Sequence, residues 1–290
     1  MPTLPPELGI NLGYKCNFNC AHCAVLEPRG IKLSRIEEDL LASTISQYRF
    51  KSVLFVGGEP TLFIPSANRI LQKAGDLTKV SVRITTNGYF ADTVGAAVRV
   101  LSSFVKLDKV LLSYDKYHAK FLPIGHIENL FHACRKLKIK FIVTMAIGSP
   151  LDLVLLKKIR QAGRFRVVMQ KVLPVGRARI NGIAHKYPSF DSGVLEKRCE
   201  NSRTLMYFCG RGFTTCCSIL VYDRNMRGVM HGTPKEHIGS EFYRLMSKLS
   251  FRGLAKRLGV SCLEFSPEHS DRCTLCAHLF NLARNRREIL

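Results

Sequence analysis

The feature of this sequence that most constrains its fold is a regular alternation of short apolar runs with longer helical patterns. The apolar, β-branched runs predict six strands: Leu8–Tyr14, Ser52–Phe55, Val80–Thr85, Lys109–Ser113, Phe141–Ile147 and Phe165–Leu173. The segments between them predict helices: Ser34–Tyr48, Ser66–Asp76, Val94–Val105, His126–Leu137 and Leu151–Ala162. Strands connected through helices in this order form a parallel sheet with right-handed crossovers. The sequence therefore predicts an α/β fold for its first 180 residues.

Three cysteines follow the first predicted strand at the spacing C-x3-C-x2-C: Cys16, Cys20 and Cys23. Soft thiolates select iron–sulfur clusters, zinc or copper(I). A lone zinc ion would need a fourth protein ligand, and no fourth cysteine or well-placed histidine lies nearby. Three ligands and one vacancy suit a [4Fe–4S] cluster. A structural zinc knuckle or a disulfide loop is the alternative.

This motif, placed directly after a first strand, resembles the radical S-adenosylmethionine (radical SAM) superfamily. The resemblance implies a partial (β/α)6 TIM-like barrel, with functional residues at the carboxyl ends of its strands. It also implies that the open iron of the cluster binds SAM. An electron donor such as a flavodoxin or ferredoxin then drives cleavage of SAM to a 5′-deoxyadenosyl radical, which takes a hydrogen atom from the substrate.

Further motifs match this family at the ends of the next strands. Gly57-Gly58-Glu59-Pro60 resembles its GGEP motif, Thr86-Asn87-Gly88 its TNG turn, and Ser113-Tyr-Asp115 its S-x-D element. The resemblance implies that the following residues bind SAM: His22, Gly57, Gly58, Glu59, Pro60, Thr85, Asn87, Ser113, Asp115 and Val172. For Asp115, a role as a helix N-cap is equally open. His118 is interpreted as a surface histidine, and Cys134 as a core thiol.

The alternating pattern ends near Pro174, so we expect a barrel in residues 1–180 and a small cysteine-rich module in residues 181–290. This module resembles the twitch or SPASM appendages of radical SAM maturases, and we expect it to hold one auxiliary [4Fe–4S] cluster. The expected ligands are Cys273, Cys276, Cys209 and Cys216, with Cys199 and Cys262 as rivals. A structural zinc ribbon is the alternative, since four thiolates also suit zinc. Two further elements are predicted: a hairpin of Ile219–Tyr222 with Gly228–His231, and a helix over Ser240–Leu258.

Cys216 and Cys217 are adjacent, and neighbouring side chains tend to diverge, so one of them is expected to be a free thiol. The arrangement resembles radical SAM peptide epimerases, in which a C-terminal thiol gives a hydrogen atom to a Cα radical. This implies a donor role for Cys217, with Cys216 second, and Cα epimerisation of a ribosomally made peptide as the reaction. Peptide crosslinking is the near alternative. Modification of RNA or a phosphorylated metabolite, and a non-catalytic iron–sulfur or zinc protein, also remain open.

The chain carries a formal net charge of +22, which favours an anionic partner such as nucleic acid, an acidic peptide or a phosphorylated small molecule. Its eleven cysteines form no secreted disulfide pattern, and iron–sulfur clusters need a reducing compartment. The N-terminus lacks the features of a secretory signal, and no run of eighteen apolar residues is present. We therefore expect a cytoplasmic protein with no membrane segment.

Overall fold

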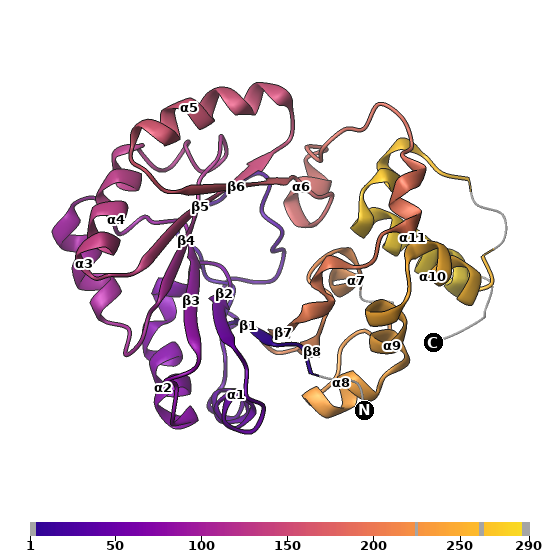
Figure 1. Cartoon of the computed structure of the whole chain (residues 1–290), viewed down its shortest axis with the longest axis horizontal. Helices are drawn as coiled ribbons and strands as arrows, with labels where there is room; N and C mark the ends of the chain where they lie inside the picture. The colour runs from indigo at the N-terminus through magenta and orange to yellow at the C-terminus, as the bar shows by residue number, and fades with distance from the viewer. Residues whose placement is uncertain (1–3, 224–225, 261–263, 286–290) are drawn as a thin grey trace.

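A single twisted sheet runs through most of the protein, with the strand order β6-β5-β4-β3-β2-β1-β7-β8 (Figure 1). The computed structural model describes residues 4–223, 226–260 and 264–285. The first six strands are mutually parallel, in the order that six successive βα units produce. They are β1 (Glu7–Asn11), β2 (Ser52–Val56), β3 (Ser81–Thr86), β4 (Lys109–Ser113), β5 (Lys140–Ile147) and β6 (Arg166–Lys171). The predicted α/β fold with a partial (β/α)6 barrel is confirmed.

The connecting helices also lie where the sequence predicts them. They are α1 (Arg35–Gln47), α2 (Ile64–Ala74), α3 (Val94–Ser102), α4 (Gly125–Lys136) and α5 (Leu153–Gln161). Helix α1 begins with a capping box, in which the Ser34 hydroxyl accepts from the Glu37 N–H and the Glu37 carboxylate accepts from the Ser34 N–H. The predicted first strand is too long, because the chain leaves the sheet after Asn11 and forms the cysteine loop. Short 3₁₀ turns precede α2 and α5: η1 (Pro60–Phe63) and η2 (Pro150–Asp152).

The strands of the barrel divide their side chains between two faces. On β2, β3 and β4, alternate residues such as Phe55, Ile84 and Leu112 are completely buried. They belong to a hydrophobic core together with residues of α1 to α4, because side chains of a strand alternate between its faces. The other positions, including Thr85 and Ser113, face the inside of the half-barrel and line a cavity there. The carboxyl ends of the strands thus carry the polar residues.

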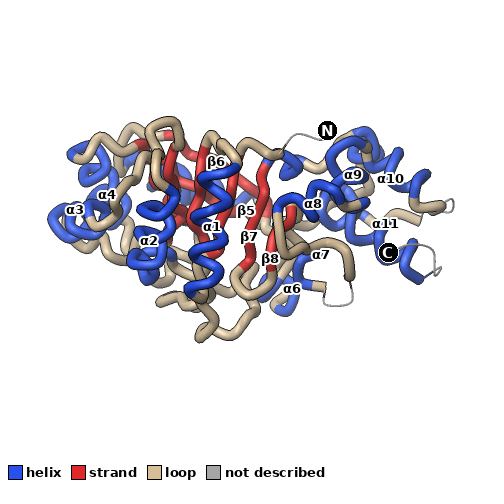
Figure 2. The backbone as a smooth tube through the Cα atoms, turned by 90° about the horizontal axis from the view of Figure 1, so that it is seen from below, coloured by secondary structure: helices blue, strands red, loops and turns tan. Residues whose placement is uncertain are grey.

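The sheet continues beyond residue 180, the expected domain boundary. Strand β7 (Thr204–Phe208) pairs in parallel with β1, and β8 (Gly212–Thr214) forms an antiparallel hairpin with β7. A second hydrophobic core, however, consists entirely of residues between Val194 and Ala283. It is covered by short helices at the far end of the molecule, as Figures 1 and 2 show. These are α7 (Ile219–Tyr222), α8 (Pro234–Gly239), α9 (Glu241–Lys248), α10 (Phe251–Arg257) and α11 (Arg272–Asn285), whereas α6 (Gly176–Ile180) lies at the end of the barrel, where its Ala178 belongs to the first core.

Two sequence predictions for this region are wrong. Ile219–Tyr222 forms the short helix α7, and the hairpin is β7–β8 instead; His231 only forms an isolated bridge with Phe213. The predicted helix over Ser240–Leu258 is broken after Lys248, because Ser250 caps a new helix by accepting from the Gly253 N–H. In both cases local patterning was overridden by capping and tertiary packing. Within the described residues, none of the helices is long and apolar enough to cross a bilayer.

Candidate active site

The loop that carries Cys16, Cys20 and Cys23 lies between β1 and α1 and is held by residues distant in sequence. The Arg177 N–H donates to the Cys23 carbonyl at 2.8 Å, and the Asn181 side chain donates to the Ala21 carbonyl at 2.8 Å. Both donors belong to α6 or follow it directly. Gly176 allows this contact, because its φ is +57° and a Cβ there would lie 2.3 Å from the Ala24 carbonyl oxygen. The loop is therefore clamped against the end of the barrel.

The Gly57-Gly58-Glu59 segment lies directly against the start of the same loop. The Gly58 N–H donates to the Gly13 carbonyl, and the Glu59 N–H donates to the Lys15 carbonyl, both at 2.9 Å. A Cβ on Gly58 would lie 2.1 Å from the Lys15 carbonyl oxygen. Gly57 has a φ of +146°, which also favours glycine. These glycines let the end of β2 approach the backbone that leads into Cys16.

Glu59 joins this segment to the TNG turn. Its buried carboxylate accepts from the Thr61 N–H and hydroxyl, from the Thr86 hydroxyl at 2.7 Å and from the Asn87 N–H at 2.8 Å. Burial raises the pKa of Glu59, against the effect of these hydrogen bonds. The Asn87 amide in turn donates to the Asn17 side chain at 2.8 Å and lies 3.7 Å from the Cys16 sulfur. Glu59 therefore connects the end of β2 to the TNG turn through hydrogen bonds. Its expected contact with SAM stays a prediction.

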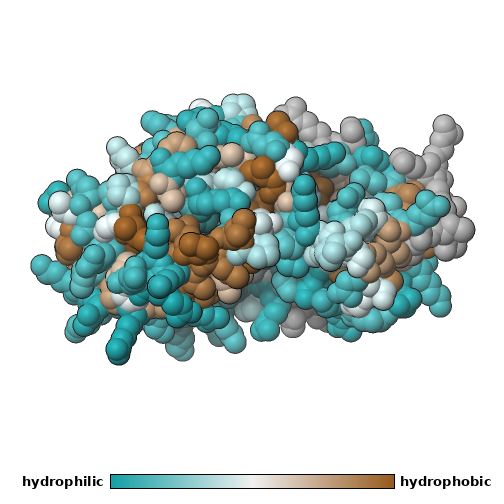
Figure 3. Space-filling model, turned by 90° about the horizontal axis from the view of Figure 1, so that it is seen from above, coloured by the Kyte–Doolittle hydropathy of each residue, from teal (hydrophilic) through white to brown (hydrophobic). Residues whose placement is uncertain are grey.

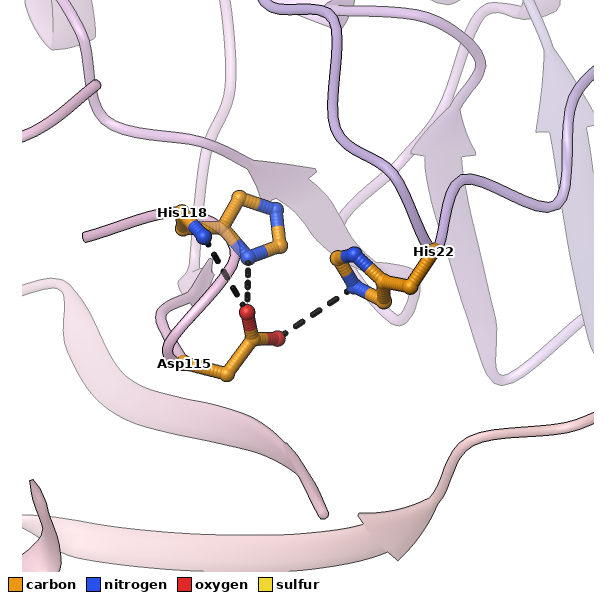
Figure 4. A group of neighbouring side chains, drawn as sticks. All are labelled: His22, Asp115 and His118. Atoms are coloured by element: carbon orange, nitrogen blue, oxygen red, sulfur yellow. Dashed lines mark hydrogen bonds and ion pairs between the residues drawn. The ribbon is translucent and has the colours of Figure 1, made fainter. Parts of the chain in front are cut away.

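Asp115, at the end of β4, lies between two imidazoles (Figure 4). Its carboxylate is 3.3 Å from Nε2 of His22 and 2.9 Å from Nδ1 of His118. It also accepts from the backbone N–H groups of Tyr117 and His118. Although burial opposes ionisation, hydrogen bonds from His118 and His22 lower the pKa of Asp115. The structure thus makes Asp115 both a cap of its own loop and a link to the cysteine loop.

The three side chains of this group place their ligand atoms within 4.8 Å of one another. His22 also stacks on Tyr117, with ring centroids 4.4 Å apart. His118 is mostly buried and lines the cavity, so its interpretation as a surface histidine is wrong. His118 follows Asp115 by three residues, so one loop can bring the two side chains together. This spacing was the feature of the sequence that could have predicted the contact.

A cavity of about 860 Å³ lies between the carboxyl ends of the barrel strands and the C-terminal module. The expected SAM-binding residues that line it are His22, Gly57, Gly58, Thr85, Asn87, Ser113 and Val172. Glu59, Pro60 and Asp115 are buried behind it. Eight cysteines also line the cavity: Cys16, Cys20, Cys23, Cys199, Cys216, Cys217, Cys273 and Cys276. The tertiary structure thus brings both sequence groups of cysteines to one space.

The first three thiols are free and close enough to interact electrostatically. Burial and the neighbouring Cys23 raise the pKa of the Cys20 thiol to about 12, so metal binding must displace its proton. Within the described chain, no three cysteine sulfurs lie within 4.8 Å of one another. Thiolates on a single zinc ion lie about 3.8 Å apart, as bonds of about 2.3 Å in a tetrahedron require. The soft, three-fold donor set fits a [4Fe–4S] cluster with one open iron.

In the C-terminal module, four thiols form a mutually interacting group: Cys199, Cys216, Cys273 and Cys276. Burial, together with the neighbouring thiols, raises the pKa of Cys273 to about 12 and raises the pKa of Cys276 well above its usual value. Cys273 and Cys276 lie on α11, a helix that the sequence analysis missed. Cys217 interacts with three of these thiols but is the most exposed of the group, and it faces the cavity.

Cys209, an expected ligand, lies elsewhere. It is buried in the core of the sheet between Tyr14, whose hydroxyl donates to its carbonyl, and the carboxylate of Glu37. Cys134 is a buried core thiol of α4, as its sequence pattern predicts. Cys262 lies outside the described residues. His231 contacts His237, with their Nδ1 atoms 3.1 Å apart, and His237 accepts from the Thr215 N–H next to Cys216.

Comparison with known proteins agrees with this site. The model of the radical SAM superfamily matches residues 10–150, which span the end of β1, the cysteine loop and strands β2 to β5. The chain is 21% identical to YydG of Bacillus subtilis strain 168, a protein named for peptide biosynthesis, over 95% of this chain and 92% of YydG. It is 27% identical to a protein of Sulfurisphaera tokodaii named as a GTP 3′,8-cyclase, over 67% of this chain and 64% of that protein.

Among solved structures, native anSMEcpe with bound AdoMet and Cp18Cys peptide superposes with a TM-score of 0.60 at 17% identity. The match covers 98% of this chain and 100% of that one, and it supports the same fold. Residues 10–150 of the chain therefore form a radical SAM domain, and the chain is a radical SAM enzyme. Membership in this family implies SAM and a [4Fe–4S] cluster as cofactors, and the three thiols of the cysteine loop fit that cluster.

Proposed function

We propose that this enzyme modifies a peptide, and that its reaction is the epimerisation of a residue at Cα. The observation that carries the proposal is Cys217, whose side chain is open to the same cavity as Cys16, Cys20 and Cys23. A substrate held in this cavity can contact both the cysteine loop and Cys217. A thiol opposite the site of radical formation is what inversion at carbon requires.

In the proposed reaction, a cluster held by Cys16, Cys20 and Cys23 would pass one electron from an external donor to SAM, which would be cleaved to methionine and the 5′-deoxyadenosyl radical. The chain positions SAM through the residues at the ends of β2, β3 and β4, and it excludes water from the cavity. The radical takes the hydrogen atom from Cα and leaves as 5′-deoxyadenosine. The Cys217 thiol then donates its hydrogen atom to the opposite face of Cα, which gives the D-residue and a sulfur radical. One electron from an external donor and one proton restore the thiol.

We further propose that Cys199, Cys216, Cys273 and Cys276 hold an auxiliary [4Fe–4S] cluster. Each of the six pairs in this set interacts electrostatically. Cys199 replaces Cys209 in the expected set. This assignment leaves Cys217 free for hydrogen transfer.

Two relatives support a peptide as substrate. YydG carries a name that refers to peptide biosynthesis, and it matches this chain over almost its full length. The structure of anSMEcpe contains a bound peptide. Short open reading frames beside this gene are therefore the first source of candidate substrates.

The test is anaerobic reconstitution with iron and sulfide, followed by reaction of SAM and candidate peptides in D₂O. We expect one solvent deuterium at Cα of one residue, a D-residue in chiral amino-acid analysis, and formation of 5′-deoxyadenosine. A peptide product that has lost two hydrogen atoms would instead identify crosslinking. 5′-Deoxyadenosine with no change in any peptide would contradict the peptide proposal.

A phosphorylated metabolite is the second candidate substrate. It is favoured by the net charge of +22 and by the similarity to a protein named as a GTP 3′,8-cyclase. It predicts that nucleoside triphosphates stimulate 5′-deoxyadenosine formation, with a strong dependence on salt because the attraction is electrostatic. Peptides and nucleotides can be compared in the same assay.

A further inference from the structure

Strand β6 is the outermost strand of the sheet, and its outer edge is open. It pairs with β5 alone. In the part of the chain that the structure describes, no strand continues the sheet on the other side of β6. At the opposite end of the sheet, β8 is closed in part by the bridge between Phe213 and His231.

The pairing with β5 fixes which backbone groups of β6 face this open edge. The Val172 N–H donates to the Ile147 carbonyl of β5 at 3.0 Å. Backbone groups of successive residues in a strand point to opposite sides. Gln170 therefore faces β5 like Val172, whereas the N–H and C=O groups of Val167, Met169 and Lys171 face outward.

Apolar side chains are exposed on β6 and on the segment that connects it to β5. Leu151 in η2 is 80% exposed, Val154 in α5 is 68% exposed and Met169 in β6 is 49% exposed. Figure 3 shows apolar side chains gathered on the face of the molecule on which α5 lies in Figure 1. Proteins usually protect exposed strand edges with charges, bulges or covering segments, and monomers rarely expose large apolar patches. Both features together indicate a surface that is covered by a binding partner.

The open edge leads directly to the candidate active site. Residues 169 to 173, at the carboxyl end of β6, line the cavity that holds the thiols of both cysteine groups. Six residues of β6 provide an edge of roughly 20 Å at about 3.3 Å per residue. A chain that lies along this edge toward the carboxyl end of β6 thus reaches the wall of this cavity, where the His185 N–H donates to the Val172 carbonyl at 2.9 Å.

We propose that an extended segment of the substrate peptide adds to the sheet as a strand along the outer edge of β6. Its apolar side chains pack on Leu151, Val154 and Met169, and the adjoining residues of the same peptide enter the cavity. The proposal rests on a peptide being the substrate. Binding of this kind gains affinity from main-chain hydrogen bonds, and side-chain pockets add specificity.

The test uses two substitutions at one position. Met169→Pro removes an outward N–H but leaves the bonds between β6 and β5 intact, as proline tolerates an edge strand. Met169→Ala removes the side chain and keeps the N–H. A phage-displayed library of random dodecapeptides is selected on the anaerobically reconstituted wild-type protein, and selected peptides are then measured on both variants. We expect Met169→Pro to weaken binding about tenfold, from the lost hydrogen bond and the bulk of the ring, and Met169→Ala to weaken it less.

A second measurement avoids dependence on the fold of the proline variant. Peptides with N-methyl groups at alternate backbone positions are measured on the wild-type protein. We expect one alternate set to lose binding and the other to retain it, because only every second N–H of an added strand faces β6.

Equal effects of both methylated sets, equal binding to Met169→Pro and wild type, or no enrichment on wild type would each overturn the proposal. The outcome is independent of the proposed reaction. Peptides that are epimerised equally by the wild type and Met169→Pro would preserve the function and reject the docking site. Peptides that bind through β6 but remain unmodified would support the docking site and reject the proposed function.

Discussion

The carboxylate of Asp115 lies 3.3 Å from Nε2 of His22, which connects the end of β4 to the loop that carries the three cysteines. His22 stands between Cys20 and Cys23, so a contact made at Asp115 affects the position of two sulfur atoms. The same carboxylate holds His118 at the cavity wall. A residue that the sequence offers as a SAM contact or a helix cap is therefore also a positioning residue for the cysteine loop.

Substitution Asp115→Asn should destabilise the protein and weaken SAM binding, because the amide cannot pair with both imidazoles. Loss of a buried charged hydrogen-bond partner costs about 1–3 kcal/mol in the free energy of unfolding. Since the pKa of Asp115 is lowered in the folded protein, its stabilisation is present above the unfolded pKa of about 4 and is lost as pH falls below it. Denaturant unfolding at pH 7 and pH 3 measures both effects.

The matched control is Asp39→Asn, which removes an exposed ion pair with Lys73. We expect it to change stability little, as exposed pairs contribute at most about 1 kcal/mol. An Asp115→Asn variant with wild-type stability at both pH values and unchanged SAM affinity would show that the contact with His22 has no positioning role.

Substitution Gly58→Ala should disturb the cysteine loop, because the new Cβ would lie 2.1 Å from the Lys15 carbonyl oxygen. Backbone has to move, and we expect a loss of more than about 1 kcal/mol in the free energy of unfolding, with less iron bound after reconstitution. Gly30→Ala, in the same loop region, is the control, since nothing lies within 4 Å of its Cβ position. Equal iron content and stability in the two variants would contradict the close approach.

Replacement of Cys16, Cys20 or Cys23 by alanine should abolish 5′-deoxyadenosine formation. Each variant leaves a [4Fe–4S] cluster with only two protein ligands, which is insufficient for a cluster that binds SAM at its open iron. Cys134→Ala is the control for loss of a thiol, because that side chain is buried in the core of α4, away from the cavity. The measurement is chromatographic quantification of 5′-deoxyadenosine. SAM cleavage at the wild-type rate in any of the three loop variants would refute the assignment of these cysteines as cluster ligands.

The auxiliary cluster predicts about eight irons per reconstituted chain, and about four in Cys199→Ala, Cys273→Ala or Cys276→Ala. Cys209→Ala should retain the full iron content, since this thiol lies in the core of the sheet and not at the cavity. Iron analysis combined with zinc analysis separates the alternatives. About four irons and one zinc ion in the wild type would identify a zinc ribbon instead.

Cys217→Ala should cleave SAM but fail to form clean product. Without the thiol, the Cα radical has no donor on its opposite face, so 5′-deoxyadenosine is formed without the matching D-residue. Mass spectrometry after reaction in D₂O measures the missing deuterium. Normal incorporation of solvent deuterium in this variant would reject Cys217 as the donor, and iron content near that of the wild type would show that the cluster ligands are intact.

Much of the barrel could be predicted because its signals are local. Each of the first six strands is a short apolar run, and each following helix has its own pattern, so the order of the sheet follows from the chain order. The motifs at Cys16, Gly58 and Asn87 could also be recognised from the sequence, because each directly follows a predicted strand. The carboxyl ends of parallel strands meet at one edge of the sheet, so these motifs were expected to lie close together.

The C-terminal module was predicted less well, because short elements are decided by packing. Ile219–Tyr222 has the composition of a strand and forms a helix, and a cap at Ser250 divides a continuous helical pattern. Strand β7 pairs with β1 across nearly two hundred residues, which no local pattern shows.

The sequence by itself determined the barrel, the cysteine loop and the glycines that approach it, because bond geometry and residue periodicity act over a few positions. Only the tertiary structure decided which distant side chains share a space. In the folded chain Cys209 is buried in the core, whereas Cys199 and Cys217 line the same cavity as the other thiols. The carboxylate of Asp115 contacts His22. These relationships depend on long-range packing, in which small differences in burial among many residues select one arrangement.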